Sequence, residues 1–342
     1  MGLPITLGRK GALWFGVTGL LFAILLYLAD LNEFLSSIGR ADPMLFAVAV
    51  LVGFSSLLVW ALVWYRYFRR MGIDAPLSRT VRMFLSGHFL NSITPLGQFG
   101  GEPIMAYIVS DNTGTDYETS LACVISADIL NATPFFTFTL GGLLYLAAFG
   151  SIDGLLLDIA ILSVLIVVVG GLVAYLLWSE NKALGAVLTT VLNLIGSRFD
   201  RAESVVESLK ERVDRIEDAF QEAGSDPRFL ATTAGFSHLA IVAQIVSLYF
   251  VFLSLGIEPD FVPLYLIVNL SVVATLSPTP GGSGTYEVAF SALVTLFFPV
   301  ELATAVTAAV LFRLTTYWPG LLVGYVSMLT LQSRPTPDGT EQ

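Results

Sequence analysis

Apolar residues in this chain come in long uninterrupted runs rather than in alternation with polar ones. Six windows carry at most one charged side chain each: residues 11–29, 43–65, 119–150, 154–178, 229–257 and 302–333. About 20 apolar residues of helix are enough to cross the hydrocarbon core of a bilayer, and every window approaches or exceeds this length. The short alternating segments of a membrane β-barrel are not visible. The pattern therefore predicts an all-α, polytopic helical membrane protein.

Two short motifs rich in proline and glycine interrupt the apolar pattern. They are SITPLGQFGGE at 92–102 and SPTPGGSGTYE at 277–287. Laid over each other without a gap, they are identical at five positions: Ser92/Ser277, Thr94/Thr279, Pro95/Pro280, Gly97/Gly282 and Glu102/Glu287. Proline and glycine break a helix, and non-helical backbone at membrane depth is tolerated only where protein or water surrounds it. The repeated pattern favours the same structural element at both places. The alternative is two ordinary loops rich in turn-forming residues.

Basic residues predict the orientation of the chain in the membrane. Arg9 and Lys10 precede the first window, a group of arginines follows the second, and seven of the seventeen basic residues fall between Lys182 and Arg228. The positive-inside rule then places both termini and residues 180–228 in the cytoplasm. We therefore expect a multi-pass protein of the cell membrane.

The number of membrane crossings follows from this predicted orientation. The six windows span fully, while residues 79–110 must enter and return from the cytoplasmic face and residues 263–298 from the external face. Two re-entrant broken hairpins that approach from opposite sides are typical of an inverted repeat, which in transporters brackets a site near the bilayer midplane. We expect four parts: repeat one at 1–178 with its tip at 92–102, a cytoplasmic linker at 179–228, repeat two at 229–332 with its tip at 277–287, and a disordered tail at 333–342.

The linker contains one amphipathic segment. In RFDRAESVVESLKERVDRIEDAFQE, residues 198–222, apolar side chains recur at steps of three and four. This pattern predicts a helix that lies along the bundle or bridges the repeats, with a short dimerising coiled coil as the alternative.

Three charged side chains are candidate substrate contacts, because a charge within the bilayer is costly unless it is paired. Arg313 lies roughly eleven residues into the last window, and Glu287 on the preceding hairpin is its expected partner. The pair is either a static salt bridge or an arginine that exchanges between Glu287 and a substrate phosphate. Glu102 and Glu287 can also cap the helices that follow them, because a helix N-terminus attracts negative charge.

Backbone amides and polar side chains complete the predicted site. The tip glycines permit close approach and can offer N–H groups to a phosphate: Gly97, Gly101, Gly281, Gly282 and Gly284. Asn91 can donate a hydrogen bond beside the first tip. Asp128 is expected on a polar interior face near Asn131 and Pro134.

Composition and charge exclude several classes of function. A net charge of −10 and a pI near 4.6 oppose binding to nucleic acid. One cysteine and two histidines 150 residues apart provide no metal cluster, and no segment resembles a soluble catalytic domain. We therefore expect no catalytic residue, no metal and no cofactor, and we expect the protein not to be an enzyme.

The two tips and the last window together resemble the membrane domain of lysylphosphatidylglycerol synthases, a family of flippase-like integral membrane proteins. The resemblance rests on the TP and GE pairs of the first tip, on PTPGGSGTYE of the second and on RLTTYWPGLLVG in the last window. It implies two inverted repeats with re-entrant helices and the translocation of a lipid with a polar head group. A basic residue commonly follows the first-tip glutamate by three positions in that family, and here Met105 stands at that position.

The function expected from these features is lipid translocation. A lipid with a polar or phosphate head group would be bound between the two tips, with its tails remaining in the bilayer. Because some relatives are fused to soluble transferase domains that this sequence does not show, synthase activity is not expected. Two alternatives stay open: a membrane-embedded transferase acting on lipid-linked substrates, and a non-catalytic partner of a separately encoded lipid-modifying or glycosyl-transferring enzyme.

Overall fold

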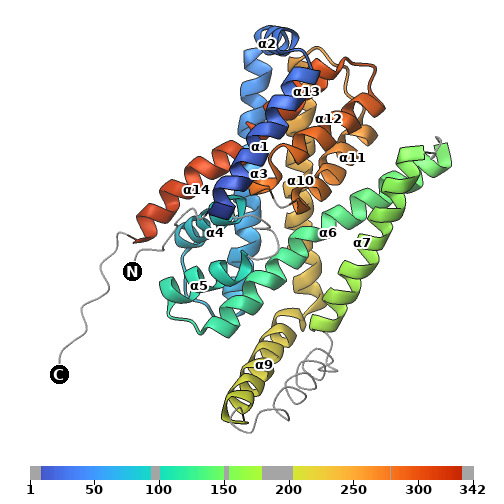
Figure 1. Cartoon of the computed structure of the whole chain (residues 1–342). Coiled ribbons are helices and arrows are strands. Elements are labelled where there is room, and N and C mark those ends of the chain that lie inside the picture. Colours follow the sequence, from blue (N-terminus) through green and yellow to red (C-terminus); the bar gives the residue numbers. More distant parts are fainter. Residues whose placement is uncertain (1–8, 94–100, 150–153, 179–202, 278, 333–342) are drawn as a thin grey trace.

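The chain folds into helices joined by turns in a computed structural model that describes residues 9–93, 101–149, 154–178, 203–277 and 279–332 (Figure 1). No β-strand occurs in these ranges. The expected linker residues up to 202, the tail, and Gly97 of the first tip lie outside the described residues. The all-α fold class is therefore confirmed for the described part of the chain.

The helices follow one another with short connections. Their bounds are α1 Arg9–Leu28, α2 Leu31–Arg40, α3 Pro43–Arg70, α4 Leu77–Ile93, α5 Glu102–Thr113, α6 Tyr117–Phe149, α7 Gly154–Trp178, α9 Glu203–Gly224, α10 Pro227–Ser254, α11 Phe261–Ser271, α12 Thr285–Phe297, α13 Leu302–Arg313 and α14 Tyr317–Gln332. Two 3₁₀ turns, η2 Val272–Leu276 and η3 Pro280–Gly282, lie between α11 and α12.

Several of these helices have the length and apolarity of membrane spans. Four do so among the described residues: 43–70, 117–145, 227–254 and 302–331, the last made of α13 and α14. A fifth is possible if α1 and α2, bent by 85° to each other, form one span. An integral, multi-pass membrane protein is therefore confirmed, whereas the count of six full spans stays a prediction.

The centre of the bundle is the pair of long helices α3 and α10, which pack antiparallel. The backbone N–H of Asp42, at the start of α3, donates to the carbonyl of Ser254 at the end of α10, with an N···O distance of 2.8 Å. At the opposite ends, the guanidinium of Arg66 donates to the hydroxyls of Thr232 and Thr233 at 2.7 and 2.9 Å. Gly53 allows the close approach, because a Cβ atom there would lie 2.7 Å from Ser247 Oγ.

Two helical hairpins lie toward opposite ends of this central pair. In Figure 1, α4 and α5 lie toward one end and α11 and α12 toward the other, while α6 and α7 form a long hairpin at the side. The α4–α5 hairpin leads into α6, and the α11–α12 hairpin leads into α13. The two helices of each hairpin pack against each other.

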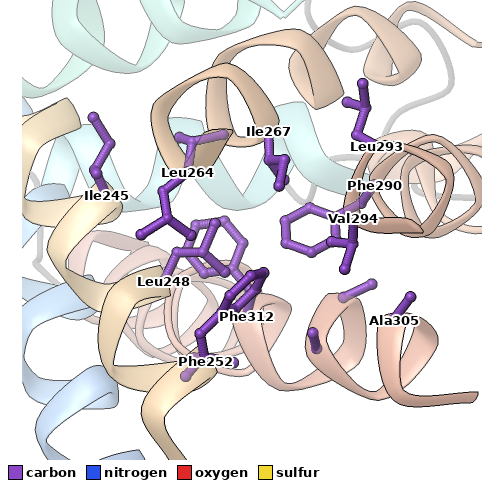
Figure 2. Close-up of a cluster of buried hydrophobic side chains, with 14 of the residues drawn as sticks. Ile245, Leu248, Phe252, Leu264, Ile267, Phe290, Leu293, Val294, Ala305 and Phe312 are labelled. Carbon is purple, nitrogen blue, oxygen red and sulfur yellow. The ribbon is translucent and has the colours of Figure 1, made fainter. Parts of the chain in front are cut away.

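A buried hydrophobic cluster fixes the second hairpin against α10 and α13 (Figure 2). Leu248 and Phe252 of α10 and Leu264 of α11 meet Phe290 of α12 in this cluster. The rings of Phe290 and Phe312 stack with centroids 5.6 Å apart. Because Phe312 immediately precedes Arg313, this packing fixes the end of α13 beside the second tip.

Two segments differ from the sequence expectation. Residues 30–42, which the apolar windows leave as a connection between 11–29 and 43–65, contain helix α2, whose Phe34 and Ser37 are buried against neighbouring residues while Leu31 and Leu35 are exposed. At ten residues, α2 is too short for a hydropathy window to detect it. The last window, expected as one continuous helix, is interrupted at 314–316, so Arg313 ends α13, although α13 and α14 together still form one candidate span over 302–331.

The amphipathic segment of the linker is confirmed as helix α9. It packs on α6 and α7, and its residues Ala219, Phe220 and Ala223 are buried. Arg215 forms an ion pair with Glu118 at the start of α6, with an N···O distance of 3.6 Å. The cytoplasmic location of α9 stays a prediction.

Candidate functional site

The second tip is a non-helical segment whose backbone requires glycine. Gly281, Gly282 and Gly284 have φ values of 55°, 66° and 88°, in the left-handed region that residues with a Cβ atom avoid. A Cβ atom on Gly282 would lie 2.6 Å from the backbone Cα of Thr275. The motif is therefore glycine-rich because the tip folds back closely on its own chain.

Hydroxyl groups close the tip internally. Ser277 Oγ lies 2.8 Å from Thr279 Oγ1 and 2.6 Å from Thr285 Oγ1. Thr285 Oγ1 is also 2.8 Å from the carbonyl oxygen of Gly282. These contacts join the two ends of the break, so the tip is a compact turn rather than an open loop.

A buried ion pair holds this tip to α13. The Nε atom of Arg313 lies 3.0 Å from Oε1 of Glu287, and the two side chains are 6% and 2% exposed. The other carboxylate oxygen of Glu287 accepts a hydrogen bond from the backbone N–H of Gly284 at 2.7 Å. Glu287 thus both caps the N-terminus of α12 and neutralises Arg313, so the two roles considered from the sequence coexist.

The guanidinium of Arg313 is held on all sides. Both terminal nitrogens donate to the carbonyl of Gly281 at 3.1 Å, and one also donates to Ser283 Oγ at 2.8 Å. The ring of Tyr317 lies 3.7 Å and that of Tyr286 4.8 Å from its central carbon. Such cation–π contacts strengthen when the cation is shielded from water. We call these residues with Glu287 the arginine cage.

Most glycine amides of the second tip already have acceptors. The N–H of Gly282 donates to the carbonyl of Thr279 at 3.0 Å, and that of Gly284 donates to Glu287. A phosphate could accept from these amides only after the internal bonds open. Gly281 contributes its carbonyl oxygen to Arg313 instead.

Of the first tip, the structure describes Ser92 and Ile93 at the end of α4, and Gly101 and Glu102 at the start of α5. Gly101 precedes α5 with a right-handed φ of −80°, and its carbonyl accepts from the N–H of Met105 at 2.9 Å. Glu102, the first residue of α5, is partly buried, and α5 packs on α6, the helix that carries Asp128. Asn91 is partly buried at the end of α4, and its Oδ1 atom has no hydrogen-bond partner in the described chain.

The predicted site residues therefore fall into two groups. Gly281, Gly282, Gly284, Glu287 and Arg313 meet in the arginine cage or its supporting turn, whereas Glu102 and Asp128 lie on the packed helices α5 and α6. Contact between η3 and α4, the helix that leads into the first tip, connects the groups.

Sequence reasoning missed Ser283, Tyr286 and Tyr317 of the cage. Tyr286 adjoins Glu287, and Tyr317 follows Arg313 by four positions, a spacing that places side chains on one helix face. The turn at 314–316 interrupts that helix, so the spacing alone did not establish the contact.

These features define a polytopic helical membrane protein with broken helices, one of them closed around a buried arginine. The chain belongs to the family described as the lysylphosphatidylglycerol synthase TM region, whose model matches residues 13–324. This confirms the resemblance seen in the tips and the last window.

Individual relatives come from archaea. A UPF0104 membrane protein of Pyrococcus horikoshii is 30% identical over 320 residues, covering 92% of this chain and 94% of the relative. A UPF0104 membrane protein of Methanothermobacter thermautotrophicus is 25% identical, covering 91% of this chain and 92% of the relative. Glycosyltransferase AglD of Haloferax volcanii is 29% identical over 92% of this chain, but the match covers 53% of AglD.

Proposed function

We propose that the protein is a lipid translocase that moves a lipid with a polar or phosphate head group across the cell membrane without catalytic chemistry of its own. The observation that carries the proposal is the second tip, a polar non-helical segment enclosed by protein among apolar helices. Non-helical backbone and a buried charge inside a membrane bundle are costly and are typical of a substrate or ion pathway.

Helix order supports two repeats of opposite orientation. The starts of α10, α11, α12 and α13 follow those of α3, α4, α5 and α6 by 184, 184, 183 and 185 residues. The first helices of the two sets, α3 and α10, run antiparallel. An inverted repeat of this kind places a transport site between the two broken hairpins. We infer that residues 1–178 and 229–332 form the two repeats and that both termini are cytoplasmic.

The proposed path runs between the two tips, with Glu102, Asp128 and Asn91 on one side and the arginine cage on the other. Arg313 would contact a head-group phosphate by exchanging its bonds to Gly281 and Ser283 for phosphate oxygens, which match its planar fork. The tip glycines would add amide donors once their internal bonds open. The lipid tails would remain among the exposed apolar side chains of the bundle.

A membrane-embedded transferase is the second candidate, because one relative is named a glycosyltransferase. About half of that relative lies outside the match, so the shared region need not carry its named activity. In the described part of the chain, no group of three His, Cys, Asp or Glu side chains could hold a metal ion. A role as partner of a separate lipid-modifying enzyme is the third candidate.

Translocation can be measured with purified protein in liposomes that contain labelled lipids. We expect the wild-type protein to move label between leaflets, and Arg313→Lys to slow this by about tenfold to a hundredfold, because a lost hydrogen bond to a charged group costs about 1.5–3 kcal/mol. Lysine keeps the charge but loses the bidentate fork. Arg40→Lys, at an exposed ion pair with Glu33, is the matched control and should leave the rate unchanged.

The outcome of this assay separates the three candidates. Movement of label without product supports the translocase, and a new lipid product supports the transferase. Neither movement nor product, with the protein folded, contradicts both and leaves the partner role.

The opposite orientation of the repeats predicts opposite accessibility of two exposed positions. Asp111 lies in the last turn of α5, at the end of the first hairpin, and Glu258 lies in the connection before the second hairpin. Cysteine introduced at Asp111 should react with an impermeant maleimide only from the cytoplasmic face, and at Glu258 only from the external face. The native Cys123 is buried and gives little background. Labelling of both positions from one side would rule out the inverted repeat.

A further inference from the structure

Helix α2 lies across the end of the bundle (Figure 1). It makes an angle of 85° with residues Gly19–Leu28 of α1, and it packs on α13. Asp30 accompanies the sharp bend: its backbone has a φ of 61°, and its carboxylate accepts a hydrogen bond from the N–H of Asn32 at 2.9 Å. Because α1 is expected to cross the bilayer, α2 is expected to lie parallel to the membrane surface.

The end of the central pair indicates the level at which α2 lies. Asp42 follows α2, and its carboxylate caps α3 by accepting from the N–H groups of Met44 and Leu45 at 2.8 and 3.0 Å. The N–H of Asp42 donates to the carbonyl of Ser254, the last residue of α10. Both α3 and α10 have the length and apolarity of membrane spans. Helix α2 therefore lies where these spans end, at the level of the lipid head groups.

One face of α2 is buried against the bundle. Phe34 and Ser37 are its buried residues. Phe34 belongs to a small hydrophobic cluster that includes Ala303 and Val306 of α13. Helices α2 and α13 therefore form one packed unit, and α13 ends at Arg313 of the arginine cage.

A second face of α2 is polar. The guanidinium of Arg40 donates to Oε1 of Glu33 at 2.8 Å and to Oγ of Ser36 at 2.9 Å. The charged side chains of this network remain accessible to water. Such a face is suited to contact with water and with lipid head groups.

The third face, which we call the apolar face of α2, is exposed. Leu31, Leu35 and Ile38 follow one another at steps of four and three, the spacing of a single helix face, and are 51%, 56% and 37% exposed. Leu28 at the end of α1 and Met44 at the start of α3 are exposed as well, so the neighbouring helices present apolar residues on both sides of α2. Because lipid covers the apolar outer surface of an integral membrane protein, the same partner is expected at this face.

We propose that the apolar face of α2 binds the boundary between the head groups and the hydrocarbon chains of the bilayer, so that α2 is an interfacial helix. Its three aliphatic side chains enter the lipid, while Glu33 and Arg40 stay toward the water. Because α2 packs on α13, this contact anchors α13 and fixes the depth of Arg313 in the bilayer. The inference rests on the membrane location of the chain and does not depend on lipid translocation.

Spin labels on two adjacent residues measure which face meets the lipid. Leu35→Cys places a nitroxide on the apolar face, and Ser36→Cys places one beside the polar network, in the full-length protein in phosphatidylcholine liposomes. Oxygen concentrates in the hydrocarbon layer, whereas a nickel chelate stays in water. The ratio of oxygen to chelate accessibility should therefore be severalfold higher at residue 35 than at residue 36. Both positions are exposed, and the native Cys123 is buried.

Two reference positions calibrate this measurement. Leu51 is exposed on α3 and represents lipid, and Glu258 is exposed in the connection after α10 and represents water. Residue 35 should resemble Leu51, and residue 36 should resemble Glu258. A label at residue 35 that the chelate reaches as readily as at Glu258 would place the apolar face in water and overturn the proposal. A label there that is shielded from both reagents would show that a second copy or another protein covers the face, which would also overturn it.

The charge of the liposomes tests the nature of the contact. Arg40 is the only basic residue of α2 and is paired with Glu33, so apolar contact rather than attraction to anionic head groups should hold the helix. The accessibility ratio at residue 35 should be the same in phosphatidylcholine and in its mixtures with phosphatidylglycerol. A high ratio in the anionic liposomes alone would contradict the apolar contact.

Two double variants test whether the apolar face anchors the helix. With the label at Ile38, Leu31→Ser with Leu35→Ser should lower the accessibility ratio severalfold. Asn32→Ala with Ser36→Ala, away from the apolar face, should leave it unchanged. Equal ratios in the two variants would mean that packing on α13 alone holds α2, and the anchoring role would be wrong. If the first variant has a lowered thermal midpoint, Leu35→Ser alone replaces it and should change the ratio in the same direction.

Discussion

Replacing Arg313 with alanine should destabilise the protein more than any other substitution of a single charged residue. The change leaves the carboxylate of Glu287, 2% exposed, without its counter-charge, and removes donors from Gly281 and Ser283. Breaking a buried ion pair by removing one partner costs about 3–5 kcal/mol, chiefly because the remaining charge stays buried and unpaired. The measurement is the midpoint of thermal unfolding in a mild detergent.

Comparison variants separate the charge from the packing. Glu287→Gln should cost less, because glutamine can still accept from the N–H of Gly284 and α12 stays capped. The double variant Arg313→Ala with Glu287→Gln should be more stable than Arg313→Ala alone, since no unpaired carboxylate remains. Arg40→Ala breaks an ion pair whose side chains are 62% and 41% exposed, and should cost at most about 1 kcal/mol. Similar losses in Arg313→Ala and Arg40→Ala would contradict this account of the cage.

The sequence was sufficient to predict the class of fold and the partner of Arg313. Uninterrupted apolar windows and two glycine-rich tips predict a helical membrane protein with broken hairpins. The cost of a lone guanidinium in a bilayer predicts the pairing with Glu287. Both predictions follow from the free energy of moving side chains from water into the bilayer. This free energy depends on composition over a window and not on the exact path of the chain.

The sequence was not sufficient where the outcome depends on packing. Both α6 and the last window contain a proline, yet α6 continues through Pro134 while the helix before Pro319 is interrupted at 314–316. Proline lacks the N–H that would bond the carbonyl of Thr315, so a break is permitted there. Arg313, which the arginine cage holds, is the last residue of α13, directly before the break.

The second prediction of large effect concerns Gly282 in the same tip. Gly282→Ala should lower the free energy of unfolding by several kcal/mol. The new methyl group collides with backbone atoms, and alanine disfavours the left-handed φ of this position. The φ of Gly282 is 66°, and its Cβ position lies 2.6 Å from the Cα atom of Thr275. The left-handed conformation alone costs a residue with a Cβ atom about 1–2 kcal/mol. Relief of the collision requires η2 and the tip to separate, and this would loosen the bonds of Thr285 and Arg313.

Gly72 is the matched control for the dihedral angle. Its φ is 69°, and no atom lies within 4 Å of its Cβ position, so Gly72→Ala retains the strain without the collision. The difference between the two thermal midpoints therefore measures the close approach of the tip to Thr275. Because the collision displaces the arginine cage, Gly282→Ala should also slow lipid translocation in the fraction that remains folded, whereas Gly72→Ala should not. Equal midpoints for the two variants would mean that the tip is not packed against η2, and the enclosure of the polar segment by protein would then be wrong.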